Sequence, residues 1–215
     1  MSCFLNSQGK PVLMQIVKAI QENKEYLGDV DGLIGDGDHG MNMNKGFTIF
    51  ASRFEDKEFS FSKGLNELGM VLMNEIGGSM GPIYGTILMD MAESIEKTGR
   101  DEIALPDFAD AVQTGLGGLC EIVDARVGDK TLVDTLAPAA TSLKKDAAAG
   151  ADFAGALVRM KEAAEAGRDS TKDMVAKFGR SSRLGERSRG VLDAGSCSCC
   201  IILSAMADGI LPLLK

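Results

Sequence analysis

The stretch Pro11–Ile20 reads PVLMQIVKAI and shows the pattern that decides the fold. Apolar side chains recur in it every three or four residues, at Val12, Leu13, Ile16, Val17 and Ile20. This spacing places them on one face of an α-helix, with the polar residues on the other face. The segment is therefore predicted to be an amphipathic helix that packs against a core.

The same period continues through the rest of the chain, whereas alternating strand patterns bounded by turn residues are almost absent. We expect further helices from about Met41, over Gly64–Ile76, from Pro82 through Met91, from Leu105 through Leu119, and over Thr131–Lys145, Phe153–Ala166, Met174–Phe178 and Ser196–Leu214. Short glycine-containing turns join them, and neither a linker nor an internal repeat divides them. The pattern predicts one all-α domain over residues 1–215, a closed barrel or bundle of about eight antiparallel helices.

Composition narrows the class of protein. The chain has 215 residues, of which 45% are hydrophobic and 25% charged, and this balance is typical of a soluble globular protein. Its net charge of −8 argues against nucleic acid as a partner, because a phosphate backbone requires a basic surface. Five cysteines with only one histidine favour reduced thiols over disulfides or zinc.

Nothing in the sequence points to a membrane. The N-terminus lacks the basic segment and apolar run of a signal peptide. The apolar tail Cys199–Leu214 is too short to span a bilayer and contains Asp208. We expect a cytoplasmic protein with no membrane partner.

The acidic loop Gly35–Asn44, GDGDHGMNMN, is the most unusual segment of the chain. Asp31, Asp36 and Asp38 lie within eight residues, and the glycines between them allow an irregular backbone on which three carboxylates converge. Converging carboxylates repel one another unless a cation lies between them, and oxygen ligands suit Mg²⁺. The loop is therefore a candidate magnesium site.

Two other interpretations compete with magnesium. An EF-hand calcium loop would need a glutamate downstream, where this chain has Phe47 and Thr48. In the other interpretation, Asp38 caps the helix that begins near Gly40 and the other carboxylates are solvated; this structural alternative stays open.

Other loops add candidate phosphate ligands. The turn Gly77–Pro82, GGSMGP, places glycines at a helix start, where backbone N–H groups attract anions. Gly128–Thr131, GDKT, echoes only the end of a Walker A motif. Arginines in the loop Gly179–Arg187 are suited to phosphate oxygens. If these loops share one end of the barrel, they form a magnesium–phosphate site.

Four stretches, in order, resemble the motifs of the dihydroxyacetone kinase L subunit family. They are LIGDGDHGMNMNKGF (33–47), GGSMGPIYGT (77–86), VGDKTLVDTLAP (127–138) and GRSSRLGERSRGVLDAG (179–195). The resemblance implies a barrel of eight helices that holds ADP or ATP at one end. It implies that the nucleotide phosphates are tied down by two Mg²⁺ ions bound to Asp31, Asp36 and Asp38.

The same resemblance assigns the nucleotide contacts. They fall on His39, Gly40, Met41, Asn42, Ser79, Met80, Leu132, Arg180, Asp193, Ala194 and Gly195. The chain departs from the family at Ser79-Met80, where a small residue and a serine are usual. It also has Asp193-Ala194-Gly195 in place of Asp-Pro-Gly, and the cysteines at 197–200 follow where small or hydroxyl residues are common. We interpret those cysteines as small packing side chains at a helix start.

The resemblance implies half of an enzyme. The ketose would be bound covalently on a separate K-type subunit, so no residue of this chain is assigned a catalytic role. His39 is expected to hydrogen-bond the nucleotide phosphates. The phosphoryl donor is either ATP or a phosphocarrier protein of the sugar phosphotransferase system, and a homodimer is left open. The alternatives are a non-catalytic, nucleotide-loaded regulatory module and a magnesium-dependent phosphate ester hydrolase.

Overall fold

The amphipathic stretch that opens the sequence forms the first long helix. In the computed structural model, which describes residues 2–215, Lys10–Glu22 is α1, with Pro11 in its first turn. Its apolar face is buried at the five predicted positions. The periodicity therefore identified both the helix and the face that packs on the core.

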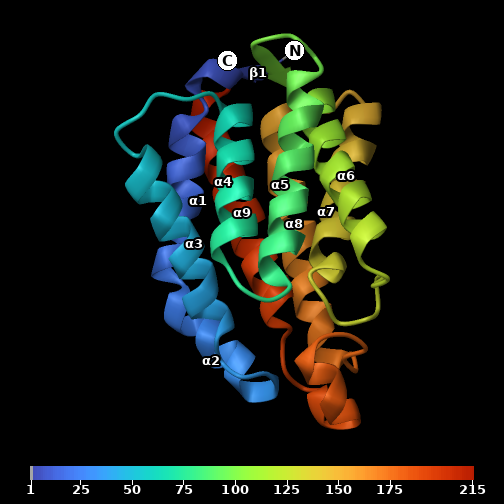
Figure 1. Cartoon of the computed structure of the whole chain (residues 1–215). Helices are drawn as coiled ribbons and strands as arrows, with labels where there is room; N and C mark the ends of the chain where they lie inside the picture. Colours follow the sequence, from blue (N-terminus) through green and yellow to red (C-terminus); the bar gives the residue numbers. More distant parts are fainter. Residues whose placement is uncertain (1) are drawn as a thin grey trace.

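The elements alternate mostly between long helices and short connections (Figure 1). In order they are β1 (Cys3–Leu5), η1 (Asn6–Gln8), α1 (Lys10–Glu22), α2 (Lys24–Ile34), α3 (His39–Phe54), α4 (Phe61–Glu75), α5 (Met80–Glu96), β2 (Glu102–Ala104), α6 (Leu105–Ile122), α7 (Val133–Ala148), α8 (Phe153–Ser170), η2 (Thr171–Asp173), η3 (Arg180–Ser188), α9 (Ala194–Ile210) and η4 (Leu211–Leu213).

Eight of the helices close into a ring. α3 packs on α4, α4 on α5, and the chain continues in this way through α6, α7, α8 and α9. α9 then packs on α1, and α1 on α3, which closes the ring, while α2 lies beside α3 and α9. The all-α prediction of a closed array of about eight helices is confirmed.

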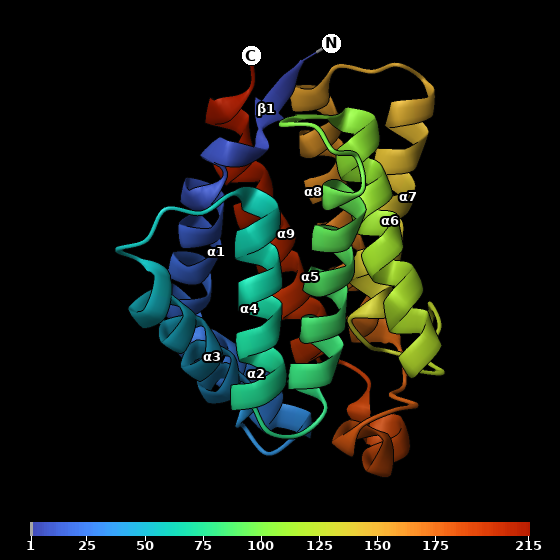
Figure 2. The same ribbon diagram turned by 45° about the horizontal axis from the view of Figure 1, so that its top comes forward.

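α9 is the most enclosed element of this ring. In both views it runs behind α4 and α5 (Figure 2). Its buried residues include Cys197, Cys199 and Cys200, each less than 5% exposed. The cysteines therefore pack the core, as their small size suggested.

Side-chain caps fix where several helices begin. Ser60 accepts a hydrogen bond from the Lys63 N–H at the start of α4, at 3.2 Å. Asp193 accepts one from the Ser196 N–H at the start of α9, at 2.7 Å. Each cap satisfies a backbone donor that has no partner inside the helix.

The local structure differs from the sequence expectations in several places. Met174–Phe178 is not helical, and the helical turns lie on either side of it, in η2 and η3. α2 was not anticipated, and the helix expected from about Met41 is α3, which begins at His39. A short antiparallel pair, β1 with β2, also ties the N-terminus to the start of α6.

The apolar C-terminal segment is longer than the tail Cys199–Leu214, which the sequence analysis judged too short to span a bilayer. Ala194–Leu213 forms one 20-residue helical segment, which is long and apolar enough to cross a membrane as judged by length and composition alone. Within this segment, 67% of the 18-residue apolar window is buried in the protein. Core helices pass the same test, and the position of α9 inside the ring accounts for its composition.

Candidate functional site

A cavity of about 720 Å³ opens at one end of the helical ring. Its walls come from the α2–α3 loop, the α4–α5 turn, the α6–α7 connection, the segment before η3 and the start of α9. Both chain termini lie at the opposite end (Figure 1). The glycine-rich loops that the sequence singled out thus gather at one end of the fold.

Most of the predicted site residues line this cavity. They are Asp31, Asp36, Asp38, His39, Asn42, Ser79, Met80, Leu132, Arg180, Asp193, Ala194 and Gly195. Gly40 and Met41 are not part of the lining: a Cβ on Gly40 would lie 2.0 Å from the Lys24 carbonyl oxygen, and Met41 is 64% exposed. Their contact with a nucleotide stays a prediction.

The three aspartates converge as the loop sequence suggested. One carboxylate oxygen from each of Asp31, Asp36 and Asp38 lies within 4.8 Å of the other two. Gly37, between the last two, has a φ of 76°, a conformation that glycine adopts without strain. Gly35 leaves the space that the Asp31 carboxylate occupies, since a Cβ there would lie 2.3 Å from Asp31 Oδ1. This all-oxygen donor set fits a hard divalent cation such as Mg²⁺.

The competing role of Asp38 as a helix cap finds no support in its contacts. Asp38 is the N-cap residue of α3, yet its side chain makes no capping hydrogen bond. Instead the carboxylate of Asp31 accepts the His39 N–H, at 3.4 Å. The Asp38 carboxylate is therefore available to the cluster.

Two basic side chains, Arg180 and Lys130, line the cavity. Arg180, at the start of η3, forms an ion pair with Asp36. Lys130 also lines the cavity and is 1% exposed; its ammonium donates to the carbonyl oxygens of Thr171, at 2.5 Å, and of Val191. Burial lowers the pKa of Lys130.

Lys130 was noted in the GDKT motif but was not assigned a role. Among residues 2–215 it is the single non-glycine residue with a positive φ, at 61°. Such a conformation costs a side-chain-bearing residue free energy and persists only where surrounding contacts enforce it. Here the two carbonyl partners join the α6–α7 connection to the end of α8 and to the segment that leads into α9.

Four helices present their N-terminal ends to the cavity. The lining includes His39 at the start of α3, Met80 at the start of α5, Leu132 just before α7 and Ala194 at the start of α9. The first turn of a helix has unpaired backbone N–H groups and a partial positive charge. Four such ends around one cavity make it electrostatically suited to anions such as phosphates.

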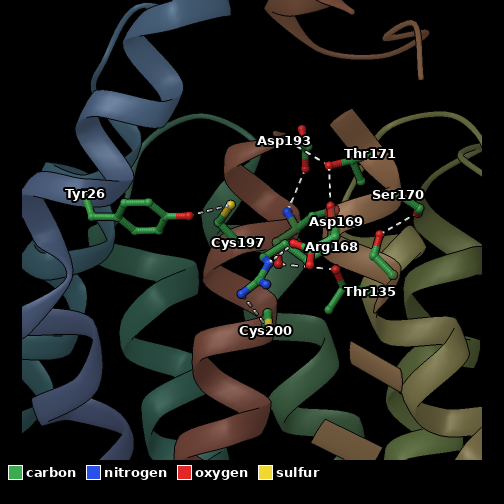
Figure 3. Close-up of polar contacts among 11 residues, drawn as sticks. Tyr26, Thr135, Arg168, Asp169, Ser170, Thr171, Asp193, Cys197 and Cys200 are labelled. Atoms are coloured by element: carbon green, nitrogen blue, oxygen red, sulfur yellow. Dashed lines mark hydrogen bonds and ion pairs between the residues drawn. The ribbon is translucent and has the colours of Figure 1, made fainter. Parts of the chain in front are cut away.

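The turn into α9 is fixed by a network from neighbouring helices (Figure 3). The Asp193 N–H donates to Thr171 Oγ1 at 3.1 Å, and the Thr171 hydroxyl donates to the Arg168 carbonyl at 2.6 Å. Burial raises the pKa of the Asp193 carboxyl to about 6. On the opposite side, Tyr26 reaches from α2 to Cys197, with 3.6 Å between the hydroxyl oxygen and Sγ.

His39 is buried in the cavity wall, with Nε2 2.8 Å from Ser198 Oγ. Burial lowers the pKa of His39 to about 4, so the ring is neutral at pH 7. Sequence reasoning missed both Ser198 and the cavity residue Tyr84, whose hydroxyl lies 2.6 Å from Ser198 Oγ. Neither has a local pattern that distinguishes it from packing residues.

The remaining lining is largely apolar and was also missed. It contains Ile34, Ile83, Val123, Ala125 and Phe178. Apolar walls with a few convergent polar groups are usual for small-molecule sites. The cavity thus combines an apolar part with an acidic cluster, two basic side chains and four helix N-termini.

Comparison with known proteins gives a consistent result. A family model described as the DAK2 domain matches residues 33–208. The PEP-dependent dihydroxyacetone kinase 1, ADP-binding subunit DhaL, of Listeria innocua is 34% identical over 87% of this chain and 88% of its own length. The PEP-dependent dihydroxyacetone kinase, ADP-binding subunit DhaL, of Escherichia coli is 34% identical over 85% of this chain and 87% of its own.

A solved structure has the same fold. The crystal structure of the dihydroxyacetone kinase from C. freundii in complex with AMP-PNP and Mg²⁺ superposes with a TM-score of 0.70 at 21% identity. The match covers 92% of this chain and 33% of that one. This chain therefore corresponds in fold to about a third of that longer protein.

Proposed function

The chain belongs to the DAK2 domain family, and on that premise we propose that it is the nucleotide-carrying subunit of a dihydroxyacetone or other short-ketose kinase. It is a phosphotransferase subunit that binds ADP or ATP with Mg²⁺ as a single domain. One observation carries this proposal: a three-carboxylate cluster, Arg180 and four helix N-termini converge on one cavity. Few ligands other than a metal-bound polyphosphate need all three.

Each part of the cavity has a role in this proposal. Bound Mg²⁺ would screen the phosphate charges and stabilise the charge of the transferring group. Asp31, Asp36 and Asp38 hold the metal, for which we propose two ions. Arg180 and the helix N-termini hold the phosphates, and the apolar walls near Phe178 accept the base.

The proposal includes two protein partners. The ketose is carried by a K-type subunit, and the phosphoryl group comes from ATP or from a phosphocarrier protein; the PEP-dependent relatives favour the phosphocarrier. Exposed apolar side chains at the rim support docking of a partner over the cavity, since each lies within two residues of its lining: Leu33, Met41, Ile122 and Val127. A homodimer and a cytoplasmic location stay predictions.

Calorimetric titration of ADP with and without Mg²⁺ tests the nucleotide site. We expect magnesium-dependent binding that is lost in Asp38→Asn with the helical circular dichroism unchanged. Asp56→Asn, on the connection between α3 and α4, is the matched control and should bind normally. Equal ADP affinity in Asp38→Asn and the wild type would overturn the metal assignment.

A coupled assay tests the kinase role. The chain is mixed with a K-type subunit, a short ketose and either ATP or a phosphocarrier, and ketose phosphate is measured. Failure with every donor, despite normal ADP binding, would favour a regulatory module. Phosphate release without any partner would favour a hydrolase. Mass spectrometry of the purified chain adds a donor test, because retained ADP favours the phosphocarrier.

A further inference from the structure

Positive charge is concentrated in residues 172–190, which we call the basic arm. The arm has six lysines and arginines against two acidic residues, a net charge of +4 in a chain whose net charge is −8. All six basic side chains are exposed: Lys172, Lys177, Arg180, Arg183, Arg187 and Arg189. η3 forms most of the arm and projects beyond the long helices at the cavity end of the ring (the orange segment at the bottom of Figure 1).

Internal hydrogen bonds give the basic arm a fixed shape. The Gly190 N–H donates to the Lys172 carbonyl at 2.7 Å and so joins the two ends of the arm. Inside the arm, the buried Ser188 hydroxyl accepts the Ala176 N–H at 2.9 Å and donates to the Gly185 carbonyl at 2.6 Å. Another backbone conformation would leave this buried hydroxyl unpaired, which costs free energy. The arm therefore presents its charges in a defined arrangement.

Only half of this positive charge is neutralised within the fold. Three of the basic side chains each pair with one carboxylate: Arg180 with Asp36, Lys177 with Asp129 and Arg189 with Glu186. The other three, Lys172, Arg183 and Arg187, form no ion pair and no side-chain hydrogen bond among residues 2–215. Single unpaired surface charges are ordinary. Three of one sign on a short segment of an acidic protein create a local potential that attracts an oppositely charged surface.

A groove of about 380 Å³ lies between the basic arm and α2, and its lining is mostly apolar. The lining residues are Tyr26, Val30 and Leu33 of α2, Lys172 and Gly190 of the arm, and Asp169, Val191 and Leu192. Tyr26 is 42% exposed and Leu33 is 66% exposed, although both side chains are large and mainly apolar. An apolar centre bordered by charged side chains is the usual anatomy of a protein–protein interface.

The arm and the groove both adjoin the cavity. Phe178 and Arg180 of the arm line the cavity, and Phe178 is 39% exposed. On α2, Leu33 lines the groove and the next residue, Ile34, lines the cavity. A molecule that is bound to the arm and the groove is therefore held beside the mouth of the cavity.

The charges around the arm favour a protein over nucleic acid or a membrane. A large polyanion that covered the arm and the groove would also meet exposed Glu25 and Asp29 of α2, which repel it. A protein surface can instead place carboxylates against the arm and an apolar side chain in the groove, because its charges are arranged individually.

We propose that the basic arm and the groove are the docking surface for an acidic face of the ketose-carrying subunit. The identity of this partner rests on the proposed function, in which the phosphoryl group must reach a ketose on a separate chain. That subunit has to approach the cavity whichever donor is used, whereas a phosphocarrier is needed with only one of the two donors. Opposite charges speed the encounter of two separate chains, and an apolar side chain in the groove slows their separation.

Charge reversal at two of the unpaired side chains tests the arm. Biosensor kinetics without nucleotide, at low and high salt, measure how the full chain binds the K-type subunit of the same organism. In Arg183→Glu/Arg187→Glu we expect association to be at least about 10-fold slower and less dependent on salt. The control Lys63→Glu/Lys145→Glu makes the same change of net charge in the first turn of α4 and the last turn of α7, at the end of the ring away from the cavity. Equal association rates in the two double variants would overturn the proposal.

Truncation of one apolar side chain tests the groove. Leu33→Ala should dissociate from the K-type subunit about 3- to 30-fold faster, because a side chain anchored in an interface is lost. Val158→Ala in α8, where the valine is 47% exposed, is the control and should dissociate like the wild type. Unchanged dissociation of Leu33→Ala would overturn the role of the groove.

Other partners and the proposed function are tested separately. The choice of partner is overturned if the arginine reversal spares binding of the K-type subunit but abolishes binding of a phosphocarrier, phosphatidylserine vesicles or duplex DNA. Calorimetry should show the same Mg²⁺-ADP affinity in the reversal variant and the wild type, since neither arginine lines the cavity. If docking depends on the arm but the wild type does not bind ADP, the proposed function fails and the docking surface stands. If ADP binds and docking does not depend on the arm, only the docking surface fails.

Discussion

The guanidinium of Arg180 forms an ion pair with the carboxylate of Asp36, one of the three carboxylates that converge at the cavity. The contact joins η3 to the α2–α3 loop, two segments far apart in the sequence. Arg180 thus neutralises charge that a divalent cation would otherwise neutralise. The same arginine is the proposed phosphate ligand, so we expect it to leave Asp36 for a phosphate when the metal and the nucleotide bind.

This exchange predicts opposite effects of one substitution. In Arg180→Met, Mg²⁺ alone should bind about 2- to 5-fold more tightly, because an exposed competing ion pair is removed. Mg²⁺-ADP should bind about 10- to 100-fold more weakly, because a charged hydrogen bond to phosphate is lost. Isothermal titration with each ligand measures both. Arg183→Met, in the same 3₁₀ segment, is the control, and equal changes in the two variants would contradict the exchange.

A side chain at position 35 should disrupt the carboxylate cluster and weaken Mg²⁺ binding. A Cβ at this position would lie 2.3 Å from Asp31 Oδ1, so Gly35→Ala must displace the Asp31 carboxylate. We expect weaker Mg²⁺ binding with little change in the melting temperature, as the loop is exposed. Gly117→Ala in α6, where no atom lies within 4 Å of the added Cβ, should bind Mg²⁺ normally. Wild-type affinity in Gly35→Ala would show that Asp31 is not a ligand.

Lys130 should contribute to stability through its two buried carbonyl partners. Lys130→Met leaves the carbonyls of Thr171 and Val191 without their donor, and we expect the free energy of unfolding to fall by about 2 to 4 kcal/mol. Lys177→Met removes a lysine whose side chain is 63% exposed and pairs with Asp129, and it should cost less than about 1 kcal/mol. Urea denaturation compares the two. A similar loss in both would assign Lys130 no special role.

The Asp193 carboxyl should make stability depend on pH. Its pKa is raised to about 6 in the folded chain, chiefly by burial, against about 3.9 in an unfolded chain. As the pH rises from 4 to 6, the unfolded state loses this proton first, so the free energy of unfolding falls. Asp193→Asn keeps an oxygen for the helix cap but does not titrate. Its stability relative to wild type should therefore rise across this window, by on the order of 1 to 3 kcal/mol, and a flat difference in urea denaturation would contradict it.

The cysteines should differ sharply in reactivity. The reactive form of a thiol is the thiolate, and burial raises the pKa of Cys197 to about 11 and also raises that of Cys199 and Cys200. Cys120 is exposed and Cys3 is half-buried. A thiol reagent should therefore modify Cys120 first, then Cys3, and the remaining three only in denaturant. Cys120→Ser should lose the fast phase, and rapid reaction of the α9 cysteines in the native chain would contradict their packing role.

The sequence by itself determined most of the long helices and the acidic loop. Periods of three and four residues report which face of a helix is buried, and this holds for α1 whatever packs on it. Convergence of Asp31, Asp36 and Asp38 also follows locally, because glycines 35 and 37 lie between them. The hydrophobic period failed in two segments. It missed α2, whose apolar face is narrow, and it predicted a helix over Met174–Phe178, where apolar residues occur in a non-helical segment.

Only the tertiary structure decided which residues face one another across the cavity. The pairing of Arg180 with Asp36, the carbonyl partners of Lys130 and the contacts of Ser198 with His39 and Tyr84 all join segments that are distant in sequence. No local period encodes such contacts, since each depends on how eight helices close into a ring and in what register they pack. In the sequence, the four helix N-termini and Ser198 look like ordinary features of an all-α chain. Only the closure of the ring brings them together at one cavity.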